Sequence, residues 1–211
     1  MSNLFVDKIS GKSGTSSGAP ITLSGDTATL SSGVTGIPAA GVTGTLGSGV
    51  AFPAGHVLQV IHGTSKEKTT VATASNVYTS IPLSASITPS STTSKILISV
   101  VVHTGSAGGA EGISGRLYKN GSNIADAMGE GSGSRQQAWF HSGEHTSGQA
   151  QHGAPASYLD SPATTSALTY QVYCSTYSAS YPVSINATQD DQDSFYSRRT
   201  ISSITLMEVA G

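Results

Sequence analysis

The sequence predicts an all-β protein in which an extended, glycine-rich N-terminal part precedes a β-sandwich or jelly-roll head. The composition changes near Phe52, since about half of residues 1–50 are Gly, Ser or Thr. From His56 onward, short apolar stretches recur at intervals of about 8–12 residues between Gly-, Ser- and Pro-rich turns, as in sandwiches and jelly rolls. No helix-length stretch has a period of 3.6 residues. We therefore divide the chain into residues 1–30, 31–53 and 54–211.

Residues 1–30 are predicted to form a docking segment. Residues 21–24 and 27–30 alternate apolar and polar side chains across a Gly25-Asp26 turn, which predicts two weak strands. Because an isolated strand pair is marginally stable in water, we expect the segment to become ordered against a partner. Its apolar contact residues are Leu4, Phe5, Val6, Ile9, Ile21 and Leu23.

Residues 31–53 contain an imperfect eight-residue repeat with starts at Gly33, Gly41 and Gly49. Strand side chains alternate with a period of two, so one set of apolar residues faces one side of an extended chain. This set is Val34, Val42, Leu46 and Val50. Three chains around a common axis can bury so sparse a row, which predicts a trimeric stem. The glycine spacing does not fit collagen, and a flexible Gly/Ser linker is the alternative.

The head is expected to hold about ten strands. The most apolar is residues 95–103, and Asn120-Gly121 predicts a tight hairpin between two others. Residues 105–115 and 142–157 are expected to be loops, where recognition commonly occurs. Alternation places Tyr170 and Tyr173 on opposite faces of one strand. The full set of expected strands is 56–62, 68–72, 77–81, a short segment ending at 87, 95–103, 115–119, 122–125, 137–141, 167–175, 182–187 and 201–209.

The composition excludes several functions. Only 10% of the residues are charged and the net charge is −2, so there is no electrostatic basis for binding nucleic acid or an anionic membrane. The first residues lack the pattern of a signal peptide, and no apolar run reaches transmembrane length. Cys174 is the sole cysteine, which excludes an intrachain disulfide and fits assembly in a reducing cytoplasm. Two glycosylation sequons, at Asn120 and Asn186, are interpreted as chance matches.

No cluster of residues predicts catalysis, a cofactor or a resident metal. His141 and His145 lie four residues apart, but Gly143 intervenes and no helical period places both on one face. A metal held between chains by single histidines stays an alternative. The acidic run 189–193 lacks the spacing of a calcium loop. A glycan hydrolase would need two placed carboxylates, and Glu111, Asp126, Glu130 and Asp160 are candidates only because they are acidic.

Exposed aromatic and histidine side chains are the predicted recognition residues. Tyrosines are concentrated in the last third of the chain, and exposed tyrosine serves protein interfaces and sugar stacking alike. The expected receptor-facing residues are His141, His145, His152, Tyr158, Tyr177 and Tyr181. A glycan-binding module without a scaffolding role is therefore a second functional hypothesis.

Three segments carry a resemblance to one family. Residues 31–47, Ser-Ser-Gly-Val-Thr-Gly-Ile-Pro-Ala-Ala-Gly-Val-Thr-Gly-Thr-Leu-Gly, resemble the stem repeats of tailed-bacteriophage fibre proteins. Residues 159–170 and 201–209 look like the C-terminal head of such fibres. Residues 7–25 are similar to N-terminal segments of fibre-like virion proteins in phages of aquatic bacteria, including cyanophages.

The resemblance implies a non-enzymatic homotrimer in the virion. Residues 1–50 would dock on other virion proteins of the tail or capsid, which makes the apolar residues of the first segment virion-anchoring. The head would then face outward and attach to a glycan or protein of the host surface. A capsid decoration or head-fibre protein is the alternative position on the particle.

Overall fold

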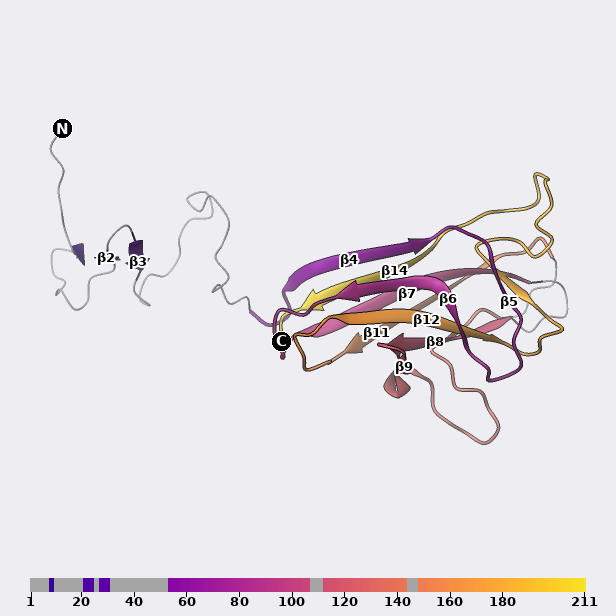
Figure 1. Cartoon of the computed structure of the whole chain (residues 1–211), viewed down its shortest axis with the longest axis horizontal. Helices are drawn as coiled ribbons and strands as arrows, with labels where there is room; N and C mark the ends of the chain where they lie inside the picture. The colour runs from indigo at the N-terminus through magenta and orange to yellow at the C-terminus, as the bar shows by residue number, and fades with distance from the viewer. Residues whose placement is uncertain (1–7, 10–20, 25–26, 31–52, 107–111, 144–147) are drawn as a thin grey trace. The chain divides into compact units, whose positions relative to one another are not determined.

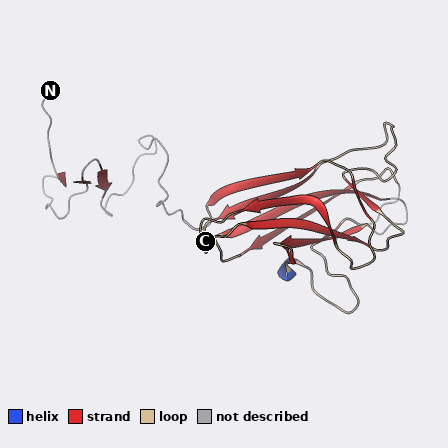
Figure 2. Ribbon diagram, viewed as in Figure 1, coloured by secondary structure: helices blue, strands red, loops and turns tan. Residues whose placement is uncertain are grey.

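The structure is a computed structural model that describes residues 8–9, 21–24, 27–30, 53–106, 112–143 and 148–211. Two compact units divide the chain, Met1–Ala51 and Phe52–Gly211, and each is described by itself. In both units the elements that the structure describes are almost all strands (Figure 2). Among the described residues, no helix is long and apolar enough to cross a membrane.

The first unit contains a three-stranded antiparallel sheet in the order β1 (Lys8–Ile9), β2 (Ile21–Ser24) and β3 (Thr27–Leu30). The β2–β3 pair agrees with the two strands expected from the alternating pattern, whereas the addition of β1 was not predicted. Ile9, Ile21 and Leu23 lie in these strands. The other predicted anchoring and stem residues lie outside the described residues: Leu4, Phe5, Val6, Val34, Val42, Leu46 and Val50.

The second unit, the head, consists of two antiparallel sheets. The first sheet has the order β4 (Val57–Ser65), β14 (Ser202–Val209), β7 (Lys95–Ser106) and β11 (His152–Asp160). β13 (Val183–Ile185) pairs with the edge of β7 that β14 also pairs with, beyond the end of β14. β5 (Thr69–Val71) pairs with β13 in turn. These antiparallel pairs form one face of a sandwich (Figure 1).

The second sheet has the order β10 (Phe140–His141), β8 (Ile113–Lys119), β12 (Leu168–Thr176) and β6 (Thr79–Ile87). A short strand, β9 (Ser122–Asn123), pairs with β8, and the 3₁₀ turn η3 (Ala125–Ala127) follows it. In chain order, the strands β4, β6, β7, β8, β10, β11, β12 and β14 alternate between the two sheets, except that β8 and the short strand β10 both belong to the second. This winding is that of a jelly roll. The predicted all-β class with two antiparallel sheets is confirmed.

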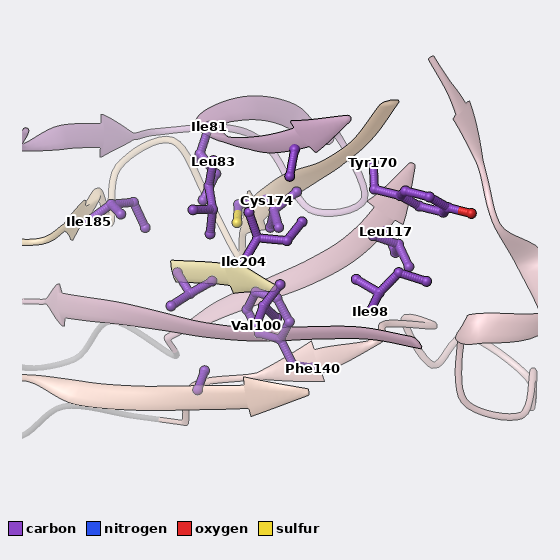
Figure 3. Packing of buried hydrophobic residues seen from close by; sticks show 14 of the residues in the cluster. Ile81, Leu83, Ile98, Val100, Leu117, Phe140, Tyr170, Cys174, Ile185 and Ile204 are labelled. Carbon is purple, nitrogen blue, oxygen red and sulfur yellow. The ribbon is translucent and has the colours of Figure 1, made fainter. Parts of the chain in front are cut away.

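Alternating side chains from both sheets fill the core (Figure 3). Ile98 and Val100 of the first sheet and Leu117 of the second are at most 3% exposed. Tyr170 is fully buried whereas its neighbour on the other face, Tyr173, is half-buried, as the alternation predicted. Cys174 lies in the same core as a free thiol, and its burial raises the pKa of the thiol.

The two sheets are also joined at their edges. Gly63 of β4 approaches β6 so closely that an added Cβ would lie 2.7 Å from the carbonyl oxygen of Ser84. Asp160 of β11 accepts hydrogen bonds from the Lys119 ammonium at 2.7 Å and the Tyr170 hydroxyl at 2.6 Å, both of the second sheet. Burial raises the pKa of the Tyr170 hydroxyl, and the hydrogen bond that this hydroxyl donates to the Asp160 carboxylate raises it further. Asp160 therefore links the two sheets.

One expectation about the loops is wrong. Residues 142–157 were expected to form a loop, but β11 begins at His152 and pairs with β7 through Asp160. Gly153 and Pro155 disfavour a strand by local propensity, yet proline is tolerated on an edge strand because its missing N–H faces away from the ladder. Pairing with the apolar strand β7 therefore overrides the local signal.

The antiparallel pairings give the head two distinct ends. At the near end, the segment entering β4 meets the C-terminus: Gly55 N–H donates to Ala210 O, and Ala210 N–H donates to His56 O, both at 2.8 Å. The opposite, far end holds the connections β4–β5, β5–β6, β12–β13 and β13–β14. Figure 1 shows the C-terminus at one end of the sheets and β5 at the other. These connections are thus separated from residues 55–56 and Ala210 by the length of the strands.

Candidate functional site

The most prominent feature of the far end is the connection between β13 and β14, residues 186–201, which we call the far-end hairpin. Its base is closed by an antiparallel bridge between Ala187 and Arg199. Thr188 N–H donates to Arg198 O at 3.1 Å, and Thr200 N–H donates to Asn186 O at 3.0 Å. The segment extends beyond the sheets (Figure 1). Because its base is paired through the backbone, the segment continues the β-structure of the sandwich as an ordered hairpin.

Asn186 anchors the base of this hairpin. It is fully buried and adopts a φ of 63°, a left-handed conformation that asparagine tolerates better than most residues. Its amide Nδ2 donates to the carbonyls of Ser65 at 3.0 Å and Glu67 at 3.1 Å, and its Oδ1 accepts from Ser202 Oγ at 2.6 Å. Because this side chain is buried and hydrogen bonded, the sequon at Asn186 is closed to glycosylation in the folded head.

A charged clamp fixes the next part of the hairpin. Arg199 binds both oxygens of Asp191, with Nε to Oδ1 at 2.8 Å and Nη2 to Oδ2 at 2.7 Å. Lys68 of the β4–β5 connection donates to Asp191 Oδ2 at 3.2 Å. Desolvation raises the pKa of Asp191, but the hydrogen bonds from Lys68 and Arg199 outweigh it and the net shift is downward. The carboxylate is therefore committed to an intramolecular ion pair.

Two aromatic side chains are displayed at the tip of this hairpin. Phe195 is 82% exposed and Tyr196 is 61% exposed, and their rings meet edge to face with centroids 5.6 Å apart. The Arg198 guanidinium lies 5.1 Å from the centre of the Phe195 ring and also donates to the Phe195 carbonyl. Adjacent exposed aromatics on an anchored hairpin are typical of a contact surface. Neither residue was among the predicted contact residues.

The structure separates the predicted recognition residues into groups. Tyr177 and Tyr181 lie in the β12–β13 connection at the far end and are 56% and 44% exposed. Tyr158 instead packs against the core from β11, half-buried, and desolvation raises the pKa of its hydroxyl. Its expected role as a receptor-facing residue therefore has little support from its position. His145 lies outside the described residues.

The described histidines make local contacts. His141 of β10 is exposed, and its Nδ1 lies 3.3 Å from Ser114 Oγ. His152, the first residue of β11, places its Nδ1 3.3 Å from Ser142 O. In the part of the chain that the structure describes, no three His, Cys, Asp or Glu side chains are grouped so that they could hold a metal ion.

A second aromatic group covers the outer face of the second sheet. The rings of Tyr118 and Tyr173 stack with centroids 3.8 Å apart, and the Arg116 guanidinium lies 4.0 Å from the ring centre of Tyr78. Gln136 donates to the Tyr78 hydroxyl at 2.8 Å. Desolvation raises the pKa of Tyr78. These rings are already covered by one another or by a cation. Phe195 and Tyr196 at the hairpin tip, in contrast, are largely exposed.

Replacement of Asp191 by Asn tests whether the clamp orders the hairpin. Asn tolerates the positive φ of 40° at this position, so Asp191→Asn removes the charge with little added backbone strain. We expect limited proteolysis within residues 192–197 to become several-fold faster, while the unfolding midpoint of the head stays near that of the wild type. Asp193→Asn is the matched control in the same hairpin, and equal cleavage of both variants would contradict the assignment.

Comparisons with known proteins yield structural neighbours only. No family model and no curated protein sequence matches the chain. Among solved structures, it is similar to the VP2 subviral particle of infectious bursal disease virus, with a TM-score of 0.37 and 12% identity over 72% of this chain. It is also similar to infectious bursal disease virus Gx strain, with a TM-score of 0.38 and 10% identity over 82% of this chain. The chain spans less than half of each neighbour, 38% and 44%.

Proposed function

We propose that the chain is a virion structural protein: a short trimeric tail fibre of a tailed bacteriophage, which docks on the particle through its N-terminal part and attaches to the host through its head. One observation carries the proposal. Chain entry and the C-terminus are hydrogen bonded together at the near end of the head. The exposed aromatics Phe195, Tyr196, Tyr177 and Tyr181 lie on connections at the opposite end. This polarity suits a head held at one end and displayed at the other.

The chemistry of the far end supports attachment to a sugar or protein surface. Two adjacent aromatic rings provide apolar area with little conformational entropy to lose, because they are held on a paired hairpin. Neighbouring serine, glutamine and aspartate side chains supply hydrogen-bond donors and acceptors. Asp191, in contrast, is occupied by Arg199 and Lys68. Binding would therefore use ring stacking and polar contacts rather than a strong net charge.

The attachment role predicts that the tip residues dominate binding. The full chain is applied to an array of bacterial surface glycans and to cultured aquatic bacteria, together with the double variant Phe195→Ala/Tyr196→Ala. Loss of two exposed aromatic contacts at the centre of an interface is expected to weaken binding at least about tenfold. A Ser84→Ala variant, on the outer face of the second sheet, is the control and should bind as the wild type does.

Two results would count against this role. Absence of wild-type binding to both glycans and cells would contradict the attachment role. Undiminished binding by the double variant would show that the contact does not involve the hairpin tip. Tyr177→Ala/Tyr181→Ala then tests the neighbouring loop. The trimer is checked separately by the mass of the full chain in solution, where three copies of the 21.3 kDa chain are expected and a monomer would contradict it.

A further inference from the structure

An apolar row crosses the outer face of the first sheet. The strand register pairs Val60 of β4 with Met207 of β14, Met207 with Leu97 of β7, and Leu97 with Leu159 of β11. All four side chains point away from the core, since their neighbours along each strand point into it. Val60 is 54% exposed and Leu159 is 47% exposed at the two ends of the row. At strand spacings of about 4.8 Å, the row spans about 14 Å.

The rest of this face is small and almost without charge. The next two rows toward the far end consist of His62, Thr205, Ser99 and Ser157, and then Thr64, Ser203, Val101 and Pro155. Toward the near end the outward residues are Val57, Val209 and Lys95, and Lys95 is the one Lys, Arg, Asp or Glu in all these rows. Apart from Lys95, these rows contain no charged side chain that would have to be desolvated when another surface covers the apolar row.

The two outer faces of the sandwich differ in this respect. On the second sheet, Tyr118 and Tyr173 stack on each other and Arg116 covers Tyr78. On the first sheet, Val60 and Leu159 remain about half exposed in the single chain. A row of aliphatic side chains gains free energy only when another surface removes it from water. We therefore expect the outer face of the first sheet, rather than that of the second, to be covered by another surface.

The position of the row indicates which surface covers it. Six residues separate Val57, the first residue of β4, from Val50, the last apolar residue of the Gly-Val-Thr repeat. If three repeats associate around an axis, the three heads that follow them in the sequence are held close together, and another copy of the head is then the nearest large surface available to this face. A face whose outward rows carry Lys95 as their one charged residue offers little complement to a strongly charged partner, and it is compatible with a copy of itself.

We infer that the outer face of the β4–β14–β7–β11 sheet is the contact between heads in the trimer, with the row Val60, Met207, Leu97 and Leu159 facing the symmetry axis. The inference rests on the proposed trimer and adds to it the surface through which the heads meet. It also leaves the far end and the outer face of the second sheet free, so the attachment loops of three copies would be displayed together.

Thiol labelling of the full chain tests this contact. Ser157→Cys places a thiol within the inferred interface, next to Leu159 on the edge strand β11, and Ser84→Cys places a matched thiol at an exposed position on the second sheet. Cys174 is fully buried and should contribute little reaction while the head stays folded. We expect a maleimide to label position 157 at least about tenfold more slowly than position 84. Adding Leu159→Glu to Ser157→Cys should restore rapid labelling.

The mass of each variant, measured in the same solution, separates the two proposals. A trimer in which both positions are labelled at the same rate would overturn the inferred contact while leaving the trimer intact through the stem. A monomeric wild type would refute the trimer itself. Protection of position 157 in a monomer would assign the cover to the chain's own residues, and that result would also overturn the inference.

Discussion

Replacement of Glu208 by Gln is expected to lower the free energy of unfolding at pH 7 by about 3 kcal/mol. Glu208 is fully buried near the C-terminal end of β14, and the ion pairs among the described residues do not include it. Its Oε1 accepts from the backbone N–H and the hydroxyl of Ser90, at 2.7 and 2.6 Å, and its Oε2 accepts from Gln59 Nε2 at 2.6 Å. The carboxylate is thus stabilised by neutral donors alone.

A glutamine at this position cannot satisfy the same partners. Its oxygen can replace Oε1 against Ser90, but its NH₂ group would then face the NH₂ group of Gln59. Gln59 cannot rotate its amide without loss, because the same Nε2 also donates to the carbonyl of Thr88 at 2.8 Å. One buried donor is therefore left unpaired. Urea unfolding should show the lost stability as a lower midpoint with an unchanged slope.

The effect should depend on pH in a defined direction. Desolvation raises the pKa of Glu208, but the hydrogen bonds from Ser90 and Gln59 outweigh it and the net pKa is below the ordinary value of 4.5. The contribution is therefore complete above about pH 4.5 and disappears as the pH falls through the lower, folded-state pKa. The difference between wild type and Glu208→Gln should shrink in acid. Glu67→Gln, at an exposed carboxylate, is the matched control and should change stability by less than about 0.5 kcal/mol at every pH.

Replacement of Gly105 by Ala is expected to lower the free energy of unfolding by about 3 kcal/mol and to loosen the far-end hairpin. Gly105 lies near the end of β7, paired with Ser184 of β13. A Cβ at this position would collide with the carbonyl oxygen of Ala187 and lie 2.9 Å from the Cα of Thr188. Both contacts are with backbone atoms at the base of the hairpin, so the added methyl group can be accommodated only if that backbone moves.

Gly153→Ala separates this collision from the general effect of adding a methyl group. Gly153 lies in β11, opposite His103 of the same β7 strand, and an added Cβ would have only ordinary contacts, the nearest at 3.4 Å to His103 Nε2. It should be neutral or raise stability by about 0.5 kcal/mol, since alanine restricts the unfolded chain. Equal urea midpoints for the two variants would show that the base of the hairpin accommodates a side chain.

Local chemistry predicted the parts of the fold that depend on neighbouring residues. Asn120 and Gly121 both adopt positive φ, 50° and 80°, and join β8 to β9 in the tight turn that the Asn-Gly pair indicates. The apolar run of 95–103 lies in the central strand β7. β11 could not be predicted in this way, because its strand state comes from pairing with β7, more than fifty residues earlier in the chain, rather than from its own Gly153 and Pro155.

The candidate site was less accessible from the sequence for the same reason. Tyr177, Tyr181 and Tyr196 all belong to the tyrosine-rich last third of the chain, but of these three only Tyr177 and Tyr181 are expected from the sequence to face a receptor. Phe195 and Tyr196 lie next to an acidic run, outside the expected strands. A pair of aromatics between an Asp run and two arginines was the available signal. Whether those charges bind a ligand or each other depends on the pairing of Asp191 with Arg199, which only the folded backbone defines.

The pairing of residues 55–56 with Ala210 has a consequence for modularity. Because both ends of the head leave from one place, sequence added before Pro53 or after Gly211 starts on the side away from the far loops. A cargo domain, an affinity tag or a second head can therefore be fused at either end without covering the hairpin tip. The same geometry allows recombination to exchange this head as a cassette between carriers of different length, because no strand of the sandwich has to be cut.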